Sequence, residues 1–505
     1  MILSRYNLKN IAADAVRVPD ESIFELPEKV LQFGTGVLLR GLPDYFIDTA
    51  NRQGLFNGRV VVVKSTAHGD TKDFDRQDCL YTLCIRGVEE GRQVEELQVN
   101  ASISRVLSAT EQWQEVLACA HNADMQVIVS NTTEVGIELV QDDVRQHPPK
   151  SFPGKLLAFL LERYLAFGGS AHSGMVIVPT ELIPDNGSRL QSIVLELAHL
   201  NGLEDRFIEW LESSNRFCNS LVDRIVPGRP EHAEAAAIEA RTGYADKLLT
   251  VSEVYRLWAI EGDERVRSVL SFAAADAGVV ITPDIDQYRE LKLRLLNGTH
   301  TLSCGLAFLA GFTTVKEAMD DSAMTTFIGE LMQQEIAPAI PYPLAPGLAQ
   351  DFSRKVLDRF ANPYLRHNWI AITMNYSSKM KMRIVPVLLE HYRTHATVPE
   401  RMALGFAAYI AFMKPVRSVE GSYFGELNGA AYPIQDDQAA SFQRRWAGLT
   451  PAALVGDVLR DTYWGAPLHE LPGFADAVID RLTGILSGGA RELLEEHPIN
   501  KANVA

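Results

Sequence analysis

Cysteine is scarce in this chain of 505 residues, and its placement argues against two classes of site. The five cysteines are scattered, odd in number and never spaced as Cys-x-x-Cys: Cys79, Cys84, Cys119, Cys218 and Cys304. A disulfide framework needs paired cysteines, and a thiolate zinc site needs clustered ones. We therefore expect a protein of a reducing compartment that holds no metal in a cysteine-built site.

Basic charge is also in deficit. The chain has 48 Lys and Arg against 64 Asp and Glu, a net charge of −16. Such a balance argues against nonspecific binding to nucleic acid or to an anionic membrane surface. A small anionic substrate is still compatible with it, because a local basic site can coexist with an acidic surface.

Long hydrophobic runs are nearly absent. The N-terminus has no apolar core long enough for a signal peptide. Residues 295–315 carry no formal charge and reach membrane-spanning length, but they include Asn297, His300 and Ser303, which hydrocarbon penalises. A buried helix is the better interpretation, and we expect a soluble cytoplasmic protein with no membrane partner.

A chain of this length predicts two or three domains. Short β-branched runs at 30–33, 60–63, 127–130 and 175–179 alternate with helical patterns at 38–50, 111–120 and 155–167. This alternation predicts an α/β domain with a parallel sheet over 1–284. From about 285 the strand patterns vanish, and amphipathic patterns predict a helical second domain over 285–505, with the active site in the cleft between the two. The helical patterns are 288–311, 316–335, 346–361, 364–374, 400–413, 450–461 and 473–496.

Two glycines follow the first predicted strand and open a helix. Gly34-Thr35-Gly36 allows a tight turn and a close approach of backbone to a pyrophosphate. The third glycine of the dinucleotide-binding pattern is missing, since Leu39 stands there. The second strand ends in Lys64 with no carboxylate nearby, so the residues leave NAD and NADP both open.

The run Lys-Leu-Arg-Leu-Leu-Asn-Gly-Thr-His places Lys292, Asn297 and His300 close together. On an α-helix, Asn297 and His300 lie about 60° apart and Lys292 about 80° from His300. A lysine held among leucines loses hydration and can exchange a proton near neutral pH. The alternative is a snorkelling lysine, a capping asparagine and a satisfied core histidine.

Two further clusters of charge stand out. Asp223-Arg224 lies in an apolar run over 217–227, where a structural ion pair is the alternative to a functional role. Residues 375–383 carry three cations in five residues, Lys379, Lys381 and Arg383. Such a run usually forms a solvated basic face, but beside a site it would attract a carboxylate.

Together these motifs resemble the polyol-specific long-chain dehydrogenase/reductase family, also called the mannitol dehydrogenase family. The resemblance rests on the 34–40 loop, on Ser130-x-Thr132-Thr133-Glu134-x-Gly136, on Val222-Asp223-Arg224-Ile225 and on the Lys292–His300 signature. It implies a Rossmann-like first domain that binds NAD, and a metal-free reaction. The cofactor-binding residues it implies are Phe33, Gly34, Thr35, Gly36, Arg40, Asn131, Thr132, Thr133 and Glu134.

The resemblance also implies the chemistry. Lys292 would remove the hydroxyl proton while hydride passes to the nicotinamide, and would protonate the forming alkoxide in the reverse direction. Asn297 and His300 would hydrogen-bond the carbonyl oxygen. The members are often monomeric, which implies a monomer whose partner is a small-molecule substrate.

Departures from the family pattern predict the substrate class. Where mannitol-type members have an Asp-Asn pair this chain has Glu181-Leu182, so Glu181 and Asn186 are the candidates to replace the missing amide. At the position of Arg289 the mannitol-type members have a glutamate, and at the position of Ala371 they have an arginine. We therefore expect a sugar acid whose carboxylate meets Arg289 or Lys379.

Asp223 and Glu181 complete the expected substrate-binding set. Four phrases are similar to the branch of the family that acts on such acids: Gln32-Phe33-Gly34, Ser130–Glu134, Glu181-Leu182-Ile183 and Tyr432-Pro433-Ile434-Gln435-Asp436-Asp437.

Rival functions stay open at this point. Within the family they are reduction of another uronate or of a plain ketose. Outside it they are a noncatalytic nucleotide-binding protein, against which the intact lysine signature argues, and an NAD-independent epimerase or isomerase that uses the same lysine as its base.

Overall fold

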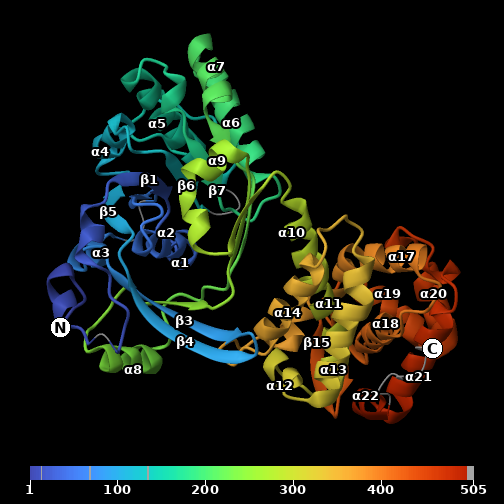
Figure 1. Ribbon diagram of the computed structural model, residues 1–505. Helices are drawn as coiled ribbons and strands as arrows, with labels where there is room; N and C mark the ends of the chain where they lie inside the picture. Colours follow the sequence, from blue (N-terminus) through green and yellow to red (C-terminus); the bar gives the residue numbers. More distant parts are fainter. Residues whose placement is uncertain (13, 67–69, 133–135, 497–505) are drawn as a thin grey trace. The chain divides into compact units, whose positions relative to one another are not determined.

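The computed structural model describes residues 1–12, 14–66, 70–132 and 136–496. The chain forms two compact units (Figure 1). The first unit is Met1–Gly87 with Gln93–Ile285, and the second is Val88–Arg92 with Asp286–Ala505.

A six-stranded parallel sheet forms the centre of the first unit, in the order β5-β2-β1-β6-β7-β8. The four strands predicted from apolar runs all belong to it, so the predicted α/β fold is confirmed. The strands are β1 Glu28–Phe33, β2 Arg59–Lys64, β5 Ile103–Ser108, β6 Val127–Ser130, β7 Val176–Pro179 and β8 Arg216–Phe217.

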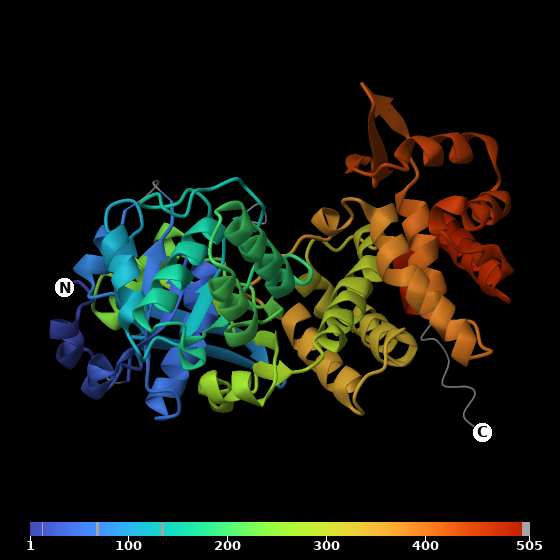
Figure 2. The same ribbon diagram turned by 90° about the horizontal axis from the view of Figure 1, so that it is seen from above.

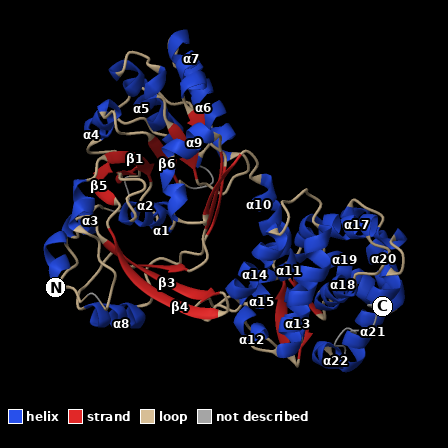
Figure 3. Cartoon of the chain, viewed as in Figure 1, coloured by secondary structure: helices blue, strands red, loops and turns tan. Residues whose placement is uncertain are grey.

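The apolar runs are continuous because both faces of this sheet are buried. In β2, Val60 and Val62 point into one core with the helix α2 Pro43–Arg52, whereas Val61 and Val63 point into another. That second core is completed by helices on the opposite face (Figures 1 and 3): α4 Trp113–Ala118, α5 Phe152–Ala166, α6 Asn186–Leu200 and α7 Asp205–Ser214. Strands alternate their side chains between faces, so a strand covered on both sides needs apolar residues throughout.

The first unit also holds two three-stranded sheets that the sequence did not reveal, β10-β3-β4 and β12-β11-β9. β3, β4, β9 and β10 carry residues of mixed polarity, whereas β11 and β12 are short apolar runs that periodicity alone does not distinguish from helix. The bounds are β3 Tyr81–Glu89, β4 Arg92–Asn100, β9 Ser220–Asp223, β10 Thr250–Glu253, β11 Leu257–Glu261 and β12 Val279–Thr282. The remaining helices are α1 Val37–Gly41, α3 Lys72–Arg76, α8 His232–Thr242 and α9 Glu264–Val269.

The second unit is mainly helical, as predicted. Its α-helices are α10 Asp286–Leu291, α11 Thr299–Leu309, α12 Val315–Met319, α13 Ser322–Glu330, α14 Leu348–Phe360, α15 Trp369–Ile372, α16 Tyr376–Lys379, α17 Val385–Thr394, α18 Glu400–Phe412, α19 Ala439–Gly448, α20 Pro451–Arg460, α21 Phe474–Gly488 and α22 Ala490–Glu496. Three π-helical segments join some of them: Lys292–Gly298, Leu331–Ile336 and Met380–Ile384. Among the described residues, no helix is both long and apolar enough to cross a bilayer.

The expectation that strands vanish after 285 is wrong. An antiparallel sheet of β13 Arg417–Val419, β14 Ser422–Leu427 and β15 Ala430–Ile434 lies in the second unit (Figure 2, dark orange arrows). Its two turns are Glu420-Gly421 and Asn428-Gly429, and all four residues have positive φ. Such two-residue turns match the twist of paired strands. Asn-Gly is the sequence signal for such a turn. In this sheet the turn residues are a clearer sequence signal than the residues of the strands.

Two glycines let the central helices α11 and α18 cross closely. A Cβ on Gly405 would lie 2.7 Å from the carbonyl oxygen of Leu302, and one on Gly305 would lie 3.1 Å from that of Ala408. Backbone cannot move aside as a flexible side chain can. The crossing therefore depends on glycine at both positions, and it fixes the helix that carries His300.

This crossing gives a first prediction. Gly405→Ala should lower the free energy of unfolding by about 1–3 kcal/mol, because the added methyl overpacks against backbone. Gly329→Ala on α13 is the matched control, since a Cβ there meets nothing within 4 Å. The control should be neutral or raise stability by about 0.5–1 kcal/mol. Urea unfolding of the three proteins measures both, and equal effects of the two substitutions would contradict the close crossing.

Candidate active site

The loops after β1 and β6 lie side by side at the carboxyl edge of the parallel sheet. The amide of Asn131 donates to the carbonyl of Phe33 at 3.1 Å, and that of Gly34 donates to Val63 on β2 at 3.0 Å. Gly34 has φ 130°, and a Cβ on it would lie 3.0 Å from the carbonyl oxygen of Asn131. Glycine is therefore required at 34 both by conformation and by space.

The position of these loops in the strand order is informative. From β1 the chain builds β2 and β5 on one side, and β6, β7 and β8 follow on the other side of β1. The strand order thus reverses between β1 and β6. In open α/β sheets a crevice forms outside the carboxyl ends of the strands at this switch point, and ligands bind there.

The side chain of Arg40 fixes the backbone of the Gly34–Gly36 loop. The guanidinium of Arg40 donates to the Thr35 carbonyl at 2.9 Å and to the Thr250 hydroxyl at 3.2 Å. Its burial lowers the pKa of Arg40. A Cβ on Gly36, by contrast, would meet nothing within 4 Å. The loop thus presents a fixed backbone with open space above its second glycine, which fits the close approach of a dinucleotide pyrophosphate.

Glu181 braces the loop after β6. One carboxylate oxygen accepts from the amide and the hydroxyl of Thr132, at 2.7 and 3.0 Å, and the other accepts from the Ser130 hydroxyl at 3.1 Å. Asn131 donates to the hydroxyl of Thr180 at 3.0 Å. Glu181 is therefore occupied inside the first unit, which suits a positioning role better than substrate contact. Thr133 and Glu134, also predicted to bind the cofactor, lie outside the described residues.

Asn186 cannot replace the amide donor of the mannitol-type members. Its side-chain amide is buried and donates to the carbonyls of Pro179, Glu181 and Ser220 at 3.0–3.1 Å. With three acceptors for its two hydrogens, it has none left for a ligand. That part of the expectation is wrong.

The residues of the Asp223-Arg224 pair end β9 and are buried. Arg224 donates to the carbonyls of Gly41 and Glu253 and lies over the ring of Tyr45, 4.6 Å from its centroid. Burial lowers the pKa of Arg224 to about 10. The arginine therefore joins β9 to the helix behind the glycine loop, and substrate contact by Asp223 stays a prediction.

Lys64 ends β2, where a cation could contact the 2′-phosphate of NADP. Its ammonium donates to the carbonyl of Thr66 at 2.5 Å, and the residue is only 7% exposed. It is not a surface lysine. Because its ammonium is bound to its own loop, it is also a poor partner for a 2′-phosphate.

In the second unit, Lys292, Asn297 and His300 come from one continuous helical stretch. Lys292 and Asn297 belong to the π-helical segment Lys292–Gly298, and His300 begins the next helix, α11. The predicted angular positions assumed α-helical turns throughout. A π-segment has wider turns, with bonds from i to i+5, so the angles change while the three residues stay on consecutive turns. Such segments are frequent at functional sites.

His300 is a buried, neutral imidazole in an aromatic setting. It stacks on Phe360 at 4.0 Å between ring centroids and meets His367 and Trp369 edge-on at 5.1 and 5.9 Å. Burial, with positive charge on its neighbours, lowers the pKa of His300 well below its usual value. Its Nε2 has no hydrogen-bond partner among the described residues. A buried ring nitrogen without a partner is uncommon and points to a bound group or water.

The charges around His300 are of one sign. The groups that lower its pKa after burial are His367, Arg359, Arg383 and Lys379, all in the second unit. Burial lowers the pKa of His367 itself, so that ring is neutral near pH 7. We call the other three, Arg359, Arg383 and Lys379, the cationic cluster. Sequence reasoning placed Lys379 near the site but missed Arg359 and His367, because no local spacing links them to Lys292.

Two reciprocal contacts join the π-segments 292–298 and 380–384. Arg294 donates from the first segment to the carbonyls of Met382 and Arg383, at 2.6 and 3.0 Å. Arg383 donates from the second to the Thr301 hydroxyl at 3.1 Å and to the carbonyl of Asn297 at 3.4 Å. These bonds fix the basic run 375–383 against the helix of the lysine signature. That run is therefore not simply a solvated face, although Lys381 within it is exposed.

Asp436 anchors the start of the same basic run. Its carboxylate accepts from the amide and the hydroxyl of Ser377, both at 2.7 Å, and from the amide of Gln438 at 2.8 Å. The amide of Asn375, at φ 54°, donates to Gln435. The phrase Tyr432–Asp437 thus acts on the site from a distance, by fixing α16, which ends at Lys379.

Arg289, the other residue predicted to bind a carboxylate, has an acidic neighbour within its own helix. Its guanidinium forms an ion pair with Asp286, three residues before it. A cation already paired is less suited to bind a ligand anion.

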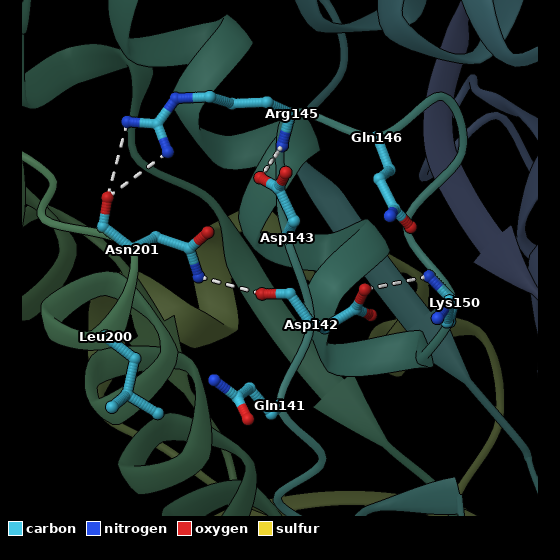
Figure 4. Close-up of a pocket in the computed structure, with 8 residues that line it drawn as sticks. All are labelled: Gln141, Asp142, Asp143, Arg145, Gln146, Lys150, Leu200 and Asn201. Carbon is cyan, nitrogen blue, oxygen red and sulfur yellow. Dashed lines mark hydrogen bonds between the residues drawn. The ribbon is translucent and has the colours of Figure 1, made fainter.

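The first unit also has a polar pocket that none of these residues lines; its lining residues are Gln141, Asp142, Asp143, Arg145, Gln146, Lys150, Leu200 and Asn201 (Figure 4). Its groups mostly bind one another. Arg145 donates to the carbonyl of Asn201 at 3.3 Å, and Asn201 donates to that of Asp142 at 3.0 Å. We read it as a stabilised loop and not as the reactive site. The described residues also hold no group of three or more His, Cys, Asp or Glu placed to bind a metal.

Comparison with known proteins agrees with this arrangement. The mannitol dehydrogenase Rossmann domain profile matches residues 28–272, and the mannitol dehydrogenase C-terminal domain profile matches 284–486. The altronate oxidoreductase of Bacillus subtilis (strain 168) is 38% identical over 491 residues, which is 95% of this chain and 97% of that protein.

Two solved structures share the fold. One is the Pseudomonas fluorescens mannitol 2-dehydrogenase ternary complex with NAD and D-mannitol, with TM-score 0.62 and 22% identity over 98% of this chain and 99% of that one. The other is a substrate-free D-sorbitol dehydrogenase, with TM-score 0.75 and 19% identity over 98% and 100%. With both of its domain profiles matched and near-complete coverage of its relatives, the chain belongs to the mannitol dehydrogenase family.

Proposed function

We propose that the protein is an NAD-dependent oxidoreductase that interconverts D-tagaturonate and D-altronate in the breakdown of hexuronates, acting in the cell as a reductase of the keto acid. The observation that carries the proposal is the similarity to altronate oxidoreductases over 95% of the chain. Arg383 and Lys379, which have no carboxylate within 4.0 Å among the described residues, support a substrate with a negative charge.

In this proposal the dinucleotide lies on the loops after β1 and β6. Gly34, Thr35 and Gly36 would approach its pyrophosphate, with Asn131 and Thr132 beside them, and bound NADH would supply the hydride. Arg40 and Glu181 would act through these loops, since both are bonded to loop backbone. NAD in place of NADP is supported by Lys64, whose ammonium is bound to its own loop.

Lys292 would be the acid and base of the reaction. In reduction its ammonium gives a proton to the alkoxide as the carbonyl carbon becomes tetrahedral, and in oxidation its amine removes the hydroxyl proton. Asn297 is partly exposed, and its side-chain amide makes no hydrogen bond with the described residues. It is thus available to donate to the reacting oxygen.

His300 would be a second donor to that oxygen. As a neutral imidazole it carries one N–H and one acceptor nitrogen, and burial together with the cationic cluster lowers its pKa so that it is neutral near pH 7. A neutral ring can polarise a carbonyl without competing with Lys292 as the proton donor. The proposal thus divides the work between a lysine that moves the proton and two groups that hold the oxygen.

The first test is the substrate. The purified protein with NADH should reduce D-tagaturonate with a higher kcat/KM than D-fructuronate or D-fructose, followed by loss of the absorbance of reduced nicotinamide. If fructose is turned over best, the sugar-acid assignment is wrong. Conversion without stoichiometric use of NADH would favour an epimerase instead.

The second test is the lysine. Lys292→Ala should lower kcat by about 10²–10⁴-fold, because proton transfer is lost, while NADH binding measured by fluorescence titration is kept. Lys355→Ala, an exposed lysine on α14 in the same unit, is the matched control and should leave kcat unchanged. Near-normal turnover by the Lys292 variant would refute the assigned role.

A further inference from the structure

Arg383 differs from most arginines of the chain in having no acidic partner. No carboxylate of the described residues lies within 4.0 Å of its guanidinium or of the ammonium of Lys379. Arg383 uses one nitrogen on Thr301 and Asn297, and its Nε is buried without a partner among the same residues. Lys379 donates to the carbonyl of Ile372 at 2.8 Å. Both cations are bonded only to neutral groups.

The two cations also repel each other. They are four residues apart on one helical stretch, and each is half-buried. Like charges at this spacing are unfavourable, more so when water is partly excluded. The nearby Cys304 does not compensate, because burial raises the pKa of its thiol to about 12 and it stays neutral. The nearest acid that acts on Lys379 is Asp436, which is already hydrogen-bonded to Ser377.

Other cations in the second unit are paired where they are buried. Arg294 is held by Glu290 at 2.9 Å, and Arg401 by Glu330 and Glu335. The absence of such a partner at Arg383 is therefore a local exception, and it occurs at a guanidinium that donates to the carbonyl of Asn297. A half-buried guanidinium without an acid is stabilised when an anionic ligand supplies the missing charge.

We infer that Arg383, together with Lys379, binds the terminal carboxylate of the substrate and so determines selectivity for sugar acids over neutral sugars. This inference rests on the proposed function and names the group that reads the charged end of the substrate. A guanidinium suits a carboxylate because two of its N–H groups can bind the two oxygens at once. Its bonds to the Asn297 carbonyl and the Thr301 hydroxyl hold this guanidinium against the helical stretch of the lysine signature.

The test compares a charged sugar with its neutral counterpart. Arg383→Met should lower kcat/KM for D-tagaturonate by about 10- to 100-fold, chiefly through KM, because a charge-assisted pair is lost. Its kcat/KM for D-tagatose, which has a hydroxymethyl group in place of the carboxylate, should change less than about 3-fold, because the bonds from Arg294 to the backbone carbonyls at 382 and 383 still join the two π-segments. Where turnover of tagatose is too slow, inhibition by D-altronate against D-altritol reports the same difference.

Lys381→Met is the matched control, since it removes a cation two residues away that is exposed and lies over Tyr463. It should alter neither substrate by more than about 2-fold, in line with an exposed surface position. If Arg383→Met fails to fold, Arg383→Lys keeps the charge but loses the paired donors, and should raise KM for the acid alone. Circular dichroism and NADH binding establish that each variant is folded.

The possible failures are distinct. If Arg383→Met impairs tagaturonate and tagatose equally, or neither, the carboxylate role is overturned while the proposed reaction stands. If the wild-type protein prefers D-fructuronate and Arg383→Met selectively impairs that acid, the proposed substrate is wrong but the carboxylate role is supported. If the wild-type protein prefers neutral sugars, both fail.

Discussion

The pairing of two π-helical segments is the constraint on which the candidate site depends. Arg294 donates from one segment to backbone carbonyls of the other, and Arg383 donates back to the carbonyl of Asn297. Wider turns leave carbonyl groups outside the regular α-helical ladder, and charged donors from the facing segment bind them. The same bonds bring a basic run that lies 82–89 residues further along the chain onto the helical stretch that bears Lys292 and His300. The contact between the two π-segments therefore determines both how these helices pack and which charged groups lie beside the lysine signature.

The parallel sheet could be read from the sequence, whereas most of the other sheets could not. Residues such as Val60–Val63 must be apolar throughout, because alternate side chains enter two different cores, and that requirement leaves a visible run. β4, by contrast, begins with exposed polar residues, and β13 is wholly exposed. For these strands the informative signal is the turn. Glu90-Gly91, Glu420-Gly421 and Asn428-Gly429 all have paired positive φ values, and a search for such pairs would have found the hairpins.

The residues of the candidate site also divide into those that the sequence predicts and those that only the structure reveals. Lys292, Asn297 and His300 lie within nine residues, so helical geometry alone predicts that they lie near one another. Phe360 and Trp369 pack on His300 from α14 and α15, and no local pattern could assign them to it. The resemblance identified the glycine loop as the cofactor-binding loop, but it did not predict which hydrogen bonds the polar residues near the loop make. Glu181 and Asn186 proved to be bonded to backbone and loop groups, because a polar residue at a strand end has to satisfy the chain before it can serve a ligand.

An acidic protein that concentrates cations around one histidine has arranged its charge locally. The net charge of −16 describes the whole chain, whereas Arg359, Arg383 and Lys379 all act on His300. Positive charge at Arg383 and Lys379 is unfavourable by itself, because neither has a carboxylate within 4.0 Å among the described residues and Asp436, the acid that acts on Lys379, holds Ser377. Such an arrangement is reasonable where the missing negative charge arrives with a ligand. Burial and the same positive charges lower the pKa of His300, so the charges that suit an anionic substrate also favour the neutral form of a group proposed to hold its reacting oxygen.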